Sequence, residues 1–300
     1  MQVSTKIFNK QSVETFSDLT RQIQKKQEQV AAGKELTKPS DDPVRSTRVM
    51  VVKEQQAQNA QYLRNIDISY VKLGLTESAL EQASNLATRA YELAVQARSD
   101  TNAGSRSVIS IELKGIRESL RELANSSDAS GRSIFGGFKI GTPPFTVDNS
   151  GNTSFTGDRG VHSVRIAPSM ELQTTIDGAS AFERSPSSSG GYVSIFSLMD
   201  TMVSELEQGT AANLPIDDLK NAASHLADQR AFIGSQMNKA DNQRQVLENR
   251  NLVLTRNISD MEDADLGKIV TDLQSLLLNK DIAQKTFSRI SQLSLFDYLS

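Results

Sequence analysis

The positions of proline limit most strongly what this chain of 300 residues can fold into. The seven prolines are Pro39, Pro43, Pro143, Pro144, Pro168, Pro186 and Pro215. Because proline lacks a backbone donor and clashes with the preceding helical turn, it interrupts helices. Residues 44–142 and 216–300 contain no proline, so long helices are expected there. The rest of the chain is expected to form joints, turns and short strands.

Both proline-free stretches carry mostly apolar residues at alternating steps of three and four, the repeat of a coiled-coil seam. One seam covers residues 49–94 and the other residues 219–261. Arg230 and Arg244 fall on the second seam, where polar residues often set the register of paired helices. The first seam predicts a helix over about residues 44–98, about 80 Å long at 1.5 Å per residue.

Two shorter helices are expected around residues 109–123 and 195–206, and Gly209 suits the end of the second one. Residues 128–191 differ, because turn residues recur every few positions. Between them, "FTV", "TSFTG" and "HSVRIA" indicate strands, and "DNSGN" indicates a hairpin turn. The sequence therefore predicts a mainly α fold with a small β-rich insertion.

The two ends of the chain have matching amphipathic patterns. Neither can bury its apolar face alone, and a short isolated helix is marginal in water. We therefore expect the terminal helices to pair with each other, with other chains, or with both. The residues predicted to form this assembly interface are Ile7, Val13, Phe16, Leu19, Ile23, Val30, Ile269, Leu273, Leu276, Phe287, Ile290 and Leu293.

The stretch "GKELTKPSDDPVRS", residues 33–46, separates two predicted helices. Its two aspartates could be a catalytic pair, or they could belong to a joint where one helix stops and the next starts. Glycine suits a helix end, and an aspartate before a proline suits an N-cap with the proline in the first helical position. Capping explains the pattern without any reaction, so we favour a joint formed by Gly33, Pro39, Asp41, Asp42 and Pro43.

Other candidate sites are weaker. Asp263, Asp265 and Gly267 alternate loosely like a calcium loop, but the glycine is misplaced and no glutamate follows at the twelfth position. A solvated helix face or a break in the seam is the favoured interpretation of this cluster. His162 and His225 have no nearby ligand-like partner in the sequence. We therefore expect no catalytic residue, no metal and no cofactor.

Composition narrows the class of protein. The chain has no cysteine, which excludes disulfides and thiol chemistry, and its net charge of −3 implies no general attraction to nucleic acid. The longest mostly apolar run, residues 273–279, is too short to span a membrane. The first 18 residues lack the apolar core of a cleaved secretory signal.

Four stretches resemble the bacterial flagellin family, and within it the hook-associated members that join hook and filament. "AGKELTKPSDDP" is similar to the family's "SGKRINKPSDDP"-like turn, although residues 34–37 depart from the usual basic-Ile-Asn run. "SGRSIFGGFK" is similar to the motif after the third helix. "ISDMEDADLGKIVTDL" contains an "IEDAD"-like segment, and "LSLFDYL" resembles the hook-associated ending.

The resemblance implies a long-helix rod or coiled-coil bundle of flagellin type with its N- and C-terminal helices paired. Residues 1–36 and 265–300 would form an inner assembly layer, residues 37–127 and 192–264 a helical rod, and residues 128–191 an outer β-rich insertion.

It further implies an extracellular structural protein of the hook–filament junction, exported by the flagellar type III route without a cleaved signal. The implied partners are hook-associated protein 1 on the hook side, flagellin on the filament side, further copies of the chain, and an export chaperone at the C-terminal helix. Neither nucleic acid nor a membrane is an expected partner.

Other functions remain open at this point. The chain could be a flagellin, the bulk subunit of the filament, although the "PSDDP" turn and the "LSLFDYL" ending argue against that. An enzyme on a helical scaffold is disfavoured because no nucleophile or metal motif is present. A cytosolic coiled-coil adaptor would share the helical pattern.

Overall fold

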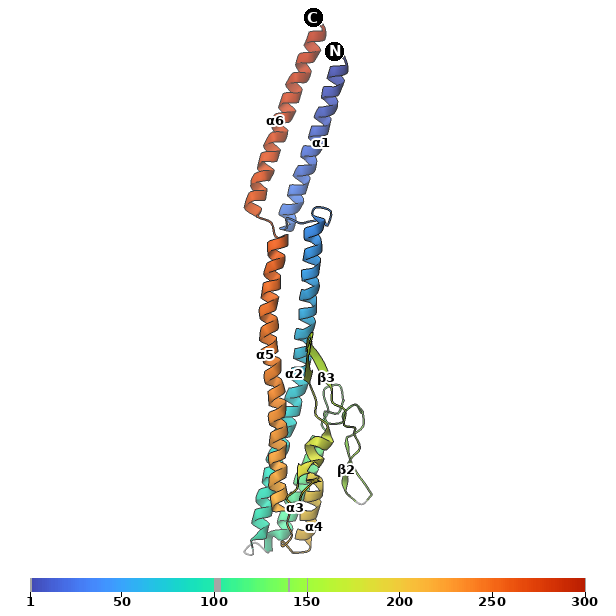
Figure 1. The fold of residues 1–300 in the computed structure, drawn as a ribbon, viewed down its shortest axis with the longest axis vertical. Helices are drawn as coiled ribbons and strands as arrows, with labels where there is room; N and C mark the ends of the chain where they lie inside the picture. Colours follow the sequence, from blue (N-terminus) through green and yellow to red (C-terminus); the bar gives the residue numbers. More distant parts are fainter. Residues whose placement is uncertain (1, 100–103, 140, 150, 300) are drawn as a thin grey trace. The chain divides into compact units, whose positions relative to one another are not determined.

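The structure, a computed structural model, describes residues 2–99, 104–139, 141–149 and 151–299, and among these the side chains from residue 6 to residue 290. Its helices are α1 (Gln2–Ala32), α2 (Pro43–Arg98), α3 (Arg106–Ala124), α4 (Ile195–Glu207), α5 (Ile216–Glu262) and α6 (Leu266–Leu299). Its strands are β1 (Phe145–Val147), β2 (Thr153–Phe155), β3 (Ser163–Ala167), β4 (Met170–Gln173), β5 (Ser185–Pro186) and β6 (Tyr192–Val193), with a π-helical turn η2 (Ala179–Glu183). The predicted mainly α fold with a small β-rich insertion is confirmed (Figure 1).

Helix limits follow the local chemistry of the sequence. α2 begins at Pro43 and runs without interruption to Arg98, which confirms the helix predicted over residues 44–98. α4 begins after Ser194, whose side chain accepts a hydrogen bond from the Phe196 amide. After α4, Gly209 has a φ of 73°, the left-handed conformation expected of a glycine that follows a helix end.

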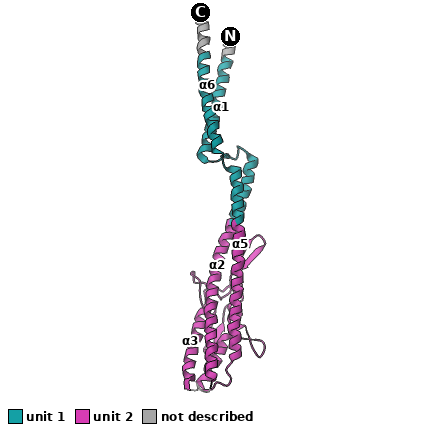
Figure 2. Ribbon diagram, turned by 90° about the vertical axis from the view of Figure 1, so that its left-hand side faces the viewer, with its two compact units in different colours: residues 1–59, 249–300 teal, residues 60–248 magenta. Residues whose placement is uncertain are grey.

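The chain forms two compact units (Figure 2). Unit 1 comprises residues 1–59 and 249–300, and unit 2 comprises residues 60–248. Both α2 and α5 therefore contribute residues to each unit. The finer division into five parts, implied by the family resemblance, stays a prediction.

Unit 2 holds the hydrophobic core, which the β-rich insertion and residues of α2, α3, α4 and α5 form together. Leu73 and Ile233, on the two predicted seams, are fully buried. The Phe145 ring centroid lies 5.6 Å from that of Phe182 and 5.2 Å from that of Phe196. Each fully buried side chain of this size contributes roughly 1.5–3 kcal/mol, so the intrachain hydrophobic stabilisation is concentrated in unit 2.

The two seam arginines join α5 to α2 inside unit 2. Arg230 Nε lies 2.6 Å from Glu77 Oε1, and its Nη2 lies 3.0 Å from Glu81 Oε1. Arg244 Nη2 lies 2.8 Å from Asp67 Oδ1. Because these pairs are possible only in one alignment of the helices, they favour a single register.

The β-rich insertion contains the predicted hairpin. β1 and β2 are antiparallel, with Phe145 opposite Phe155. The "DNSGN" turn closes them, where Asp148 Oδ1 accepts a hydrogen bond from the Asn152 amide at 2.9 Å. Gly151 in this turn has a φ of 86°, which side chains other than glycine rarely tolerate.

The structure contains a second antiparallel hairpin, formed by β3 and β4. The sequence predicts only its first strand. β4 reads Met-Glu-Leu-Gln, a composition with little strand propensity, so its sequence did not indicate a strand. Contacts with the helices hold this hairpin in place. Asn65 Nδ2 donates to the Arg165 carbonyl at 2.7 Å, and Lys239 Nζ donates to the Glu171 carbonyl at 2.7 Å.

Unit 1 contains α1, α6 and the adjoining ends of α2 and α5. α1 packs against α6, so the predicted pairing of the terminal helices is confirmed. The end of α5 lies beside the start of α2, where Gln56 Nε2 donates to Thr255 Oγ1 at 3.0 Å. Among the described residues, no helix is long and apolar enough to cross a membrane.

Candidate assembly surface and helical joint

Aromatic side chains hold the outer part of the α1–α6 pair. Phe287 stacks on Phe8 with ring centroids 5.9 Å apart and meets Phe16 edge-on at 5.8 Å. Closer to the joint, Ile23 and Ile269 are the best buried apolar residues of the pair, at 6% and 5% exposure. Among the described side chains of these two helices, of 31 and 34 residues, no other apolar residue is buried to this extent.

Among the described side chains, an ion pair links the two terminal helices. Lys26 Nζ lies 2.9 Å from Asp272 Oδ2, and the hydrogen bond from Lys26 lowers the pKa of the Asp272 carboxyl. Both side chains remain partly open to solvent, so water and salt screen the pair and it contributes little to stability. Its main effect is to favour one alignment of α1 along α6.

The predicted assembly residues lie in two environments. Those that are buried or half-buried are Phe16, Leu19, Ile23, Val30, Ile269, Leu273, Leu276 and Phe287. Ile7, Val13 and Ile290 are exposed, at 56%, 64% and 41%. Leu293 lies outside the residues whose side chains are described. The buried and half-buried residues therefore pack mainly within the chain, and the three exposed residues are free to contact other chains.

Unit 1 exposes far more apolar side chains than it buries. Among the side chains described there, four apolar residues are buried: Ile23, Val49, Leu254 and Ile269. Thirteen large apolar residues are exposed: Ile7, Val13, Val44, Met50, Val51, Leu252, Val253, Leu266, Val270, Leu277, Leu278, Ile282 and Ile290. We call these thirteen residues the exposed apolar set. Exposed apolar surface on this scale is typical of regions that bind other proteins.

The joint between α1 and α2 has the predicted capping chemistry. Gly33 follows α1 with a φ of 65°. Asp42 is the N-cap of α2: its Oδ1 accepts from the Arg45 amide at 2.9 Å, and its carbonyl accepts from the Ser46 amide at 2.9 Å. Pro43 occupies the first helical position. These contacts give Asp42 a structural role and leave the catalytic interpretation without support.

Asp41 and Pro39 shape the same segment. Pro39 is the second residue of a turn in which the Asp41 amide donates to the Lys38 carbonyl at 3.0 Å, a position that proline favours. Asp41 Oδ1 accepts from Lys25 Nζ of α1 at 2.8 Å, and this hydrogen bond holds the pKa of Asp41 below its usual value. The turn is therefore tied to the last part of α1.

A second connector, between α5 and α6, lies against the first, and the sequence did not reveal this contact. Lys34 and Asp263 form an isolated antiparallel bridge. Beside it, the Glu35 amide donates to the Glu262 carbonyl at 2.8 Å and the Ala264 amide donates to the Gly33 carbonyl at 3.1 Å. The joint therefore consists of two antiparallel segments held together by backbone hydrogen bonds.

Glu262 ends α5 beside this bridge and is 8% exposed. Its carboxylate lies 2.5 Å from Lys53 Nζ and 2.9 Å from Lys34 Nζ. Burial alone raises the pKa of the Glu262 carboxyl, but the hydrogen bonds from Lys53 and Lys34 outweigh it, so the pKa lies below its usual value. The side chain is therefore a charged, paired carboxylate.

The acidic cluster after α5 is a helix break. Asp265 Oδ1 accepts a hydrogen bond from the Lys268 amide at 3.1 Å, which caps the start of α6. Across the described part of the chain, no group of three or more metal-ligating side chains comes together. A break in the seam was one of the two favoured interpretations, and the structure supports it.

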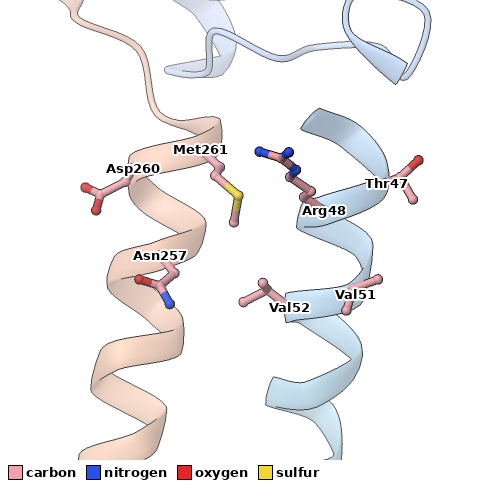
Figure 3. A pocket seen from close by; sticks show the side chains of 7 residues that line it. All are labelled: Thr47, Arg48, Val51, Val52, Asn257, Asp260 and Met261. Carbon is pink, nitrogen blue, oxygen red and sulfur yellow. The ribbon is translucent and has the colours of Figure 1, made fainter. Parts of the chain in front are cut away.

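A shallow groove of about 510 Å³ lies between the start of α2 and the end of α5. Figure 3 shows Arg48 and Val52 from α2 and Met261 from α5 pointing into it, while Thr47 points away. The groove borders Val51, which is 49% exposed and belongs to the exposed apolar set. It extends the apolar surface of unit 1 beyond the terminal helices.

Two family models match most of the chain. The bacterial flagellin N-terminal helical region matches residues 3–139, and the bacterial flagellin C-terminal helical region matches residues 216–299. Residues 140–215, which include most of the β-rich insertion, fall between the two matches.

Full-length relatives and solved structures agree with these matches. The chain is 28% identical to the flagellar hook-associated protein 3 of Salmonella typhimurium and 26% identical to that of Escherichia coli, in each case over 99% of both chains. Its fold is similar to that of FlgL from Xanthomonas campestris, with a TM-score of 0.62 and 23% identity over 69% of this chain and 99% of the other.

Proposed function

This chain belongs to the bacterial flagellin family, and we propose that it is a structural protein of the junction between the flagellar hook and filament. Similarity along the whole chain to two hook-associated proteins 3 supports this function over that of a bulk flagellin. As a structural member of this family, the chain is not an enzyme.

The observation that carries an assembly function is the imbalance within unit 1. Four apolar side chains are buried there, against thirteen in the exposed apolar set. Because burying one Val, Leu, Ile or Met contributes roughly 1.5–3 kcal/mol, neighbouring subunits that cover part of this set would gain substantial stabilisation. The surface is therefore suited to polymerisation through the terminal helices and the adjoining ends of α2 and α5.

A junction requires different neighbours on its two sides. The partners that we propose are hook-associated protein 1 on the hook side, flagellin on the filament side, and further copies of this chain around the axis. The joint of Gly33, Pro39, Asp41, Asp42 and Pro43 would set the direction of the terminal helices in the assembly.

We also propose that the chain is exported through the flagellar type III apparatus and that a chaperone covers α6 beforehand. Leu277, Leu278 and Ile282 on α6 are 47%, 59% and 52% exposed. Free chains with such a helix would be prone to associate before export. The absence of cysteine means that no disulfide has to form or break on this route.

Immunogold electron microscopy of intact flagella tests the junction function. Antibody raised against residues 140–191 should label a single site between hook and filament, because this part of the insertion falls between the two flagellin-family matches. A strain lacking the gene provides the control for antibody specificity, and anti-flagellin antibody marks the filament. Label along the whole filament would contradict the proposal and identify a flagellin.

A further inference from the structure

The two connectors of unit 1 form one closed contact. The segment after α1 and the segment after α5 exchange two backbone hydrogen bonds, from the Glu35 amide to the Glu262 carbonyl and from the Ala264 amide to the Gly33 carbonyl. Gln29 of α1 adds to it, because its Nε2 donates to the Glu35 carbonyl at 2.7 Å. Two hydrogen bonds between short connectors are a small bridge, so its persistence depends on the side chains around it.

Glu262 contacts more than one segment at this bridge. Its Oε2 accepts from Lys34 of the first connector, and its Oε1 accepts from Lys53 of α2. Its own backbone belongs to the last turn of α5. One carboxylate thus joins the connector after α1, the start of α2 and the end of α5.

The burial of Glu262 makes this contact specific. A charge that is 8% exposed is costly unless it is paired, and both carboxylate oxygens here have a lysine partner. If the bridge opens, Lys34 moves away with its connector and the carboxylate loses a partner. Closing of the bridge and pairing of Glu262 therefore favour each other.

We propose that Glu262 is a positioning residue: by pairing with Lys34 and Lys53, it holds the connector after α1 and the connector after α5 together. Two paired connectors, and not one flexible segment, then form the joint. We call this three-residue contact the lock. The lock acts within one chain and does not depend on the place of the chain in the flagellum. The lock uses residues from both halves of the sequence: Lys34 and Lys53 from the first half and Glu262 from the second.

Residue-resolved hydrogen exchange on the full chain tests the lock. Glu262→Gln keeps the shape of the side chain but removes its charge, so the Glu35 and Ala264 amides should exchange about tenfold faster or more. Asp260→Asn is the matched control: it removes an exposed carboxylate from the same helical turn that makes no hydrogen bond or ion pair among the described residues, and it should leave both rates unchanged. Core amides of unit 2, such as that of Leu73, should also be unaffected.

A double-mutant comparison separates the lock from a general loss of stability. Lys34→Met combined with Lys53→Met should speed the same two amides, and adding Glu262→Gln should not multiply the two effects, because they remove one shared interaction. Three results would overturn the proposal: unchanged rates in Glu262→Gln, fully multiplicative effects, or connector amides that are unprotected in the unmodified chain.

Discussion

At the scale of single residues, Asp42 is the clearest test of the joint. It caps α2 through its side chain and its carbonyl, and replacing such a cap with alanine costs about 1 kcal/mol. We predict that Asp42→Ala raises the population of frayed α2 starts about fivefold and reduces incorporation at the junction. The core of unit 2 should melt at an unchanged temperature by circular dichroism.

Ser40→Ala is the control for Asp42→Ala, since Ser40 is exposed in the turn just before Asp42 and, among the described residues, its side chain makes no hydrogen bond. It should change neither incorporation nor melting. Equal losses of incorporation and of core stability in Asp42→Ala would mean that Asp42 supports the fold generally and not the joint.

We predict that acid destabilises the joint, because the carboxyl groups of Asp41 and Glu262 stabilise it only when they are charged. Both have pKa values lowered from the usual 3.8 and 4.5. The Lys25 hydrogen bond is the main cause for Asp41. For Glu262, burial raises the pKa, but the hydrogen bonds from Lys53 and Lys34 together outweigh it. A lowered pKa stabilises the folded joint fully above the usual value, and that stabilisation is lost as the pH falls through the lowered one.

Hydrogen exchange at a series of pH values, corrected for the intrinsic rate of each amide, measures this loss. Protection of the Glu35 amide should be constant above about pH 5 and fall below the usual pKa of Glu262, 4.5. In Glu262→Gln the part of the dependence that comes from Glu262 should disappear, and the part that comes from Asp41 should remain. Protection that increased on acidification would contradict the assignment of both lysine pairs.

At the residue level, helix ends and starts follow from causes that are local in sequence. Gly33, Asp42 and Pro43 lie within eleven positions, so their helix-ending and helix-starting roles follow from local backbone chemistry. Glu262 could not be assigned in this way, because Lys34 lies 228 positions away. The sequence does not show which residue pairs with a charged side chain at the end of a long helix, because the two connectors come together only in the folded chain.

At the scale of elements, the α1–α6 pair depends on Phe287. Its contacts with Phe8 and Phe16 contribute about 0.5–1.5 kcal/mol each beyond their area. We predict that Phe287→Ala weakens the pair by about 1–3 kcal/mol and lowers helicity at 222 nm at temperatures where the unit 2 core remains folded.

Ile282→Ala tests a residue of the same helix that is exposed and not packed within the chain. Ile282 is 52% exposed, so its loss should leave helicity of the free chain nearly unchanged and should lower incorporation at the junction. If both variants reduced helicity to the same extent, the division between contacts within the chain and contacts reserved for neighbours would be wrong for α6.

Elements were predictable in proportion to their length and periodicity. α2 was predicted within one residue of its start, because Pro43 and an uninterrupted seam define it. β1 and β2 followed from the "DNSGN" turn. β4 was missed because a four-residue strand beside β3 depends on the helices that support it, through Asn65 and Lys239, and not on its own composition.

At the scale of the whole molecule, stability and assembly are assigned to different parts of the chain. The continuous hydrophobic core lies within unit 2, whereas unit 1 carries the exposed apolar set. The periodicity of the sequence indicated that the terminal helices need partners. It could not separate residues such as Phe287, which are satisfied within the chain, from residues such as Val13, which are exposed.

The most direct test is gold labelling of the junction in cells whose only copy of this protein lacks residues 1–32 and 266–300. Circular dichroism of the same purified chain establishes that its core is folded, and its melting temperature should match that of the full chain. The account predicts no label between hook and filament despite a folded core. Label at the density of the full chain would contradict the claim that the terminal helices carry assembly.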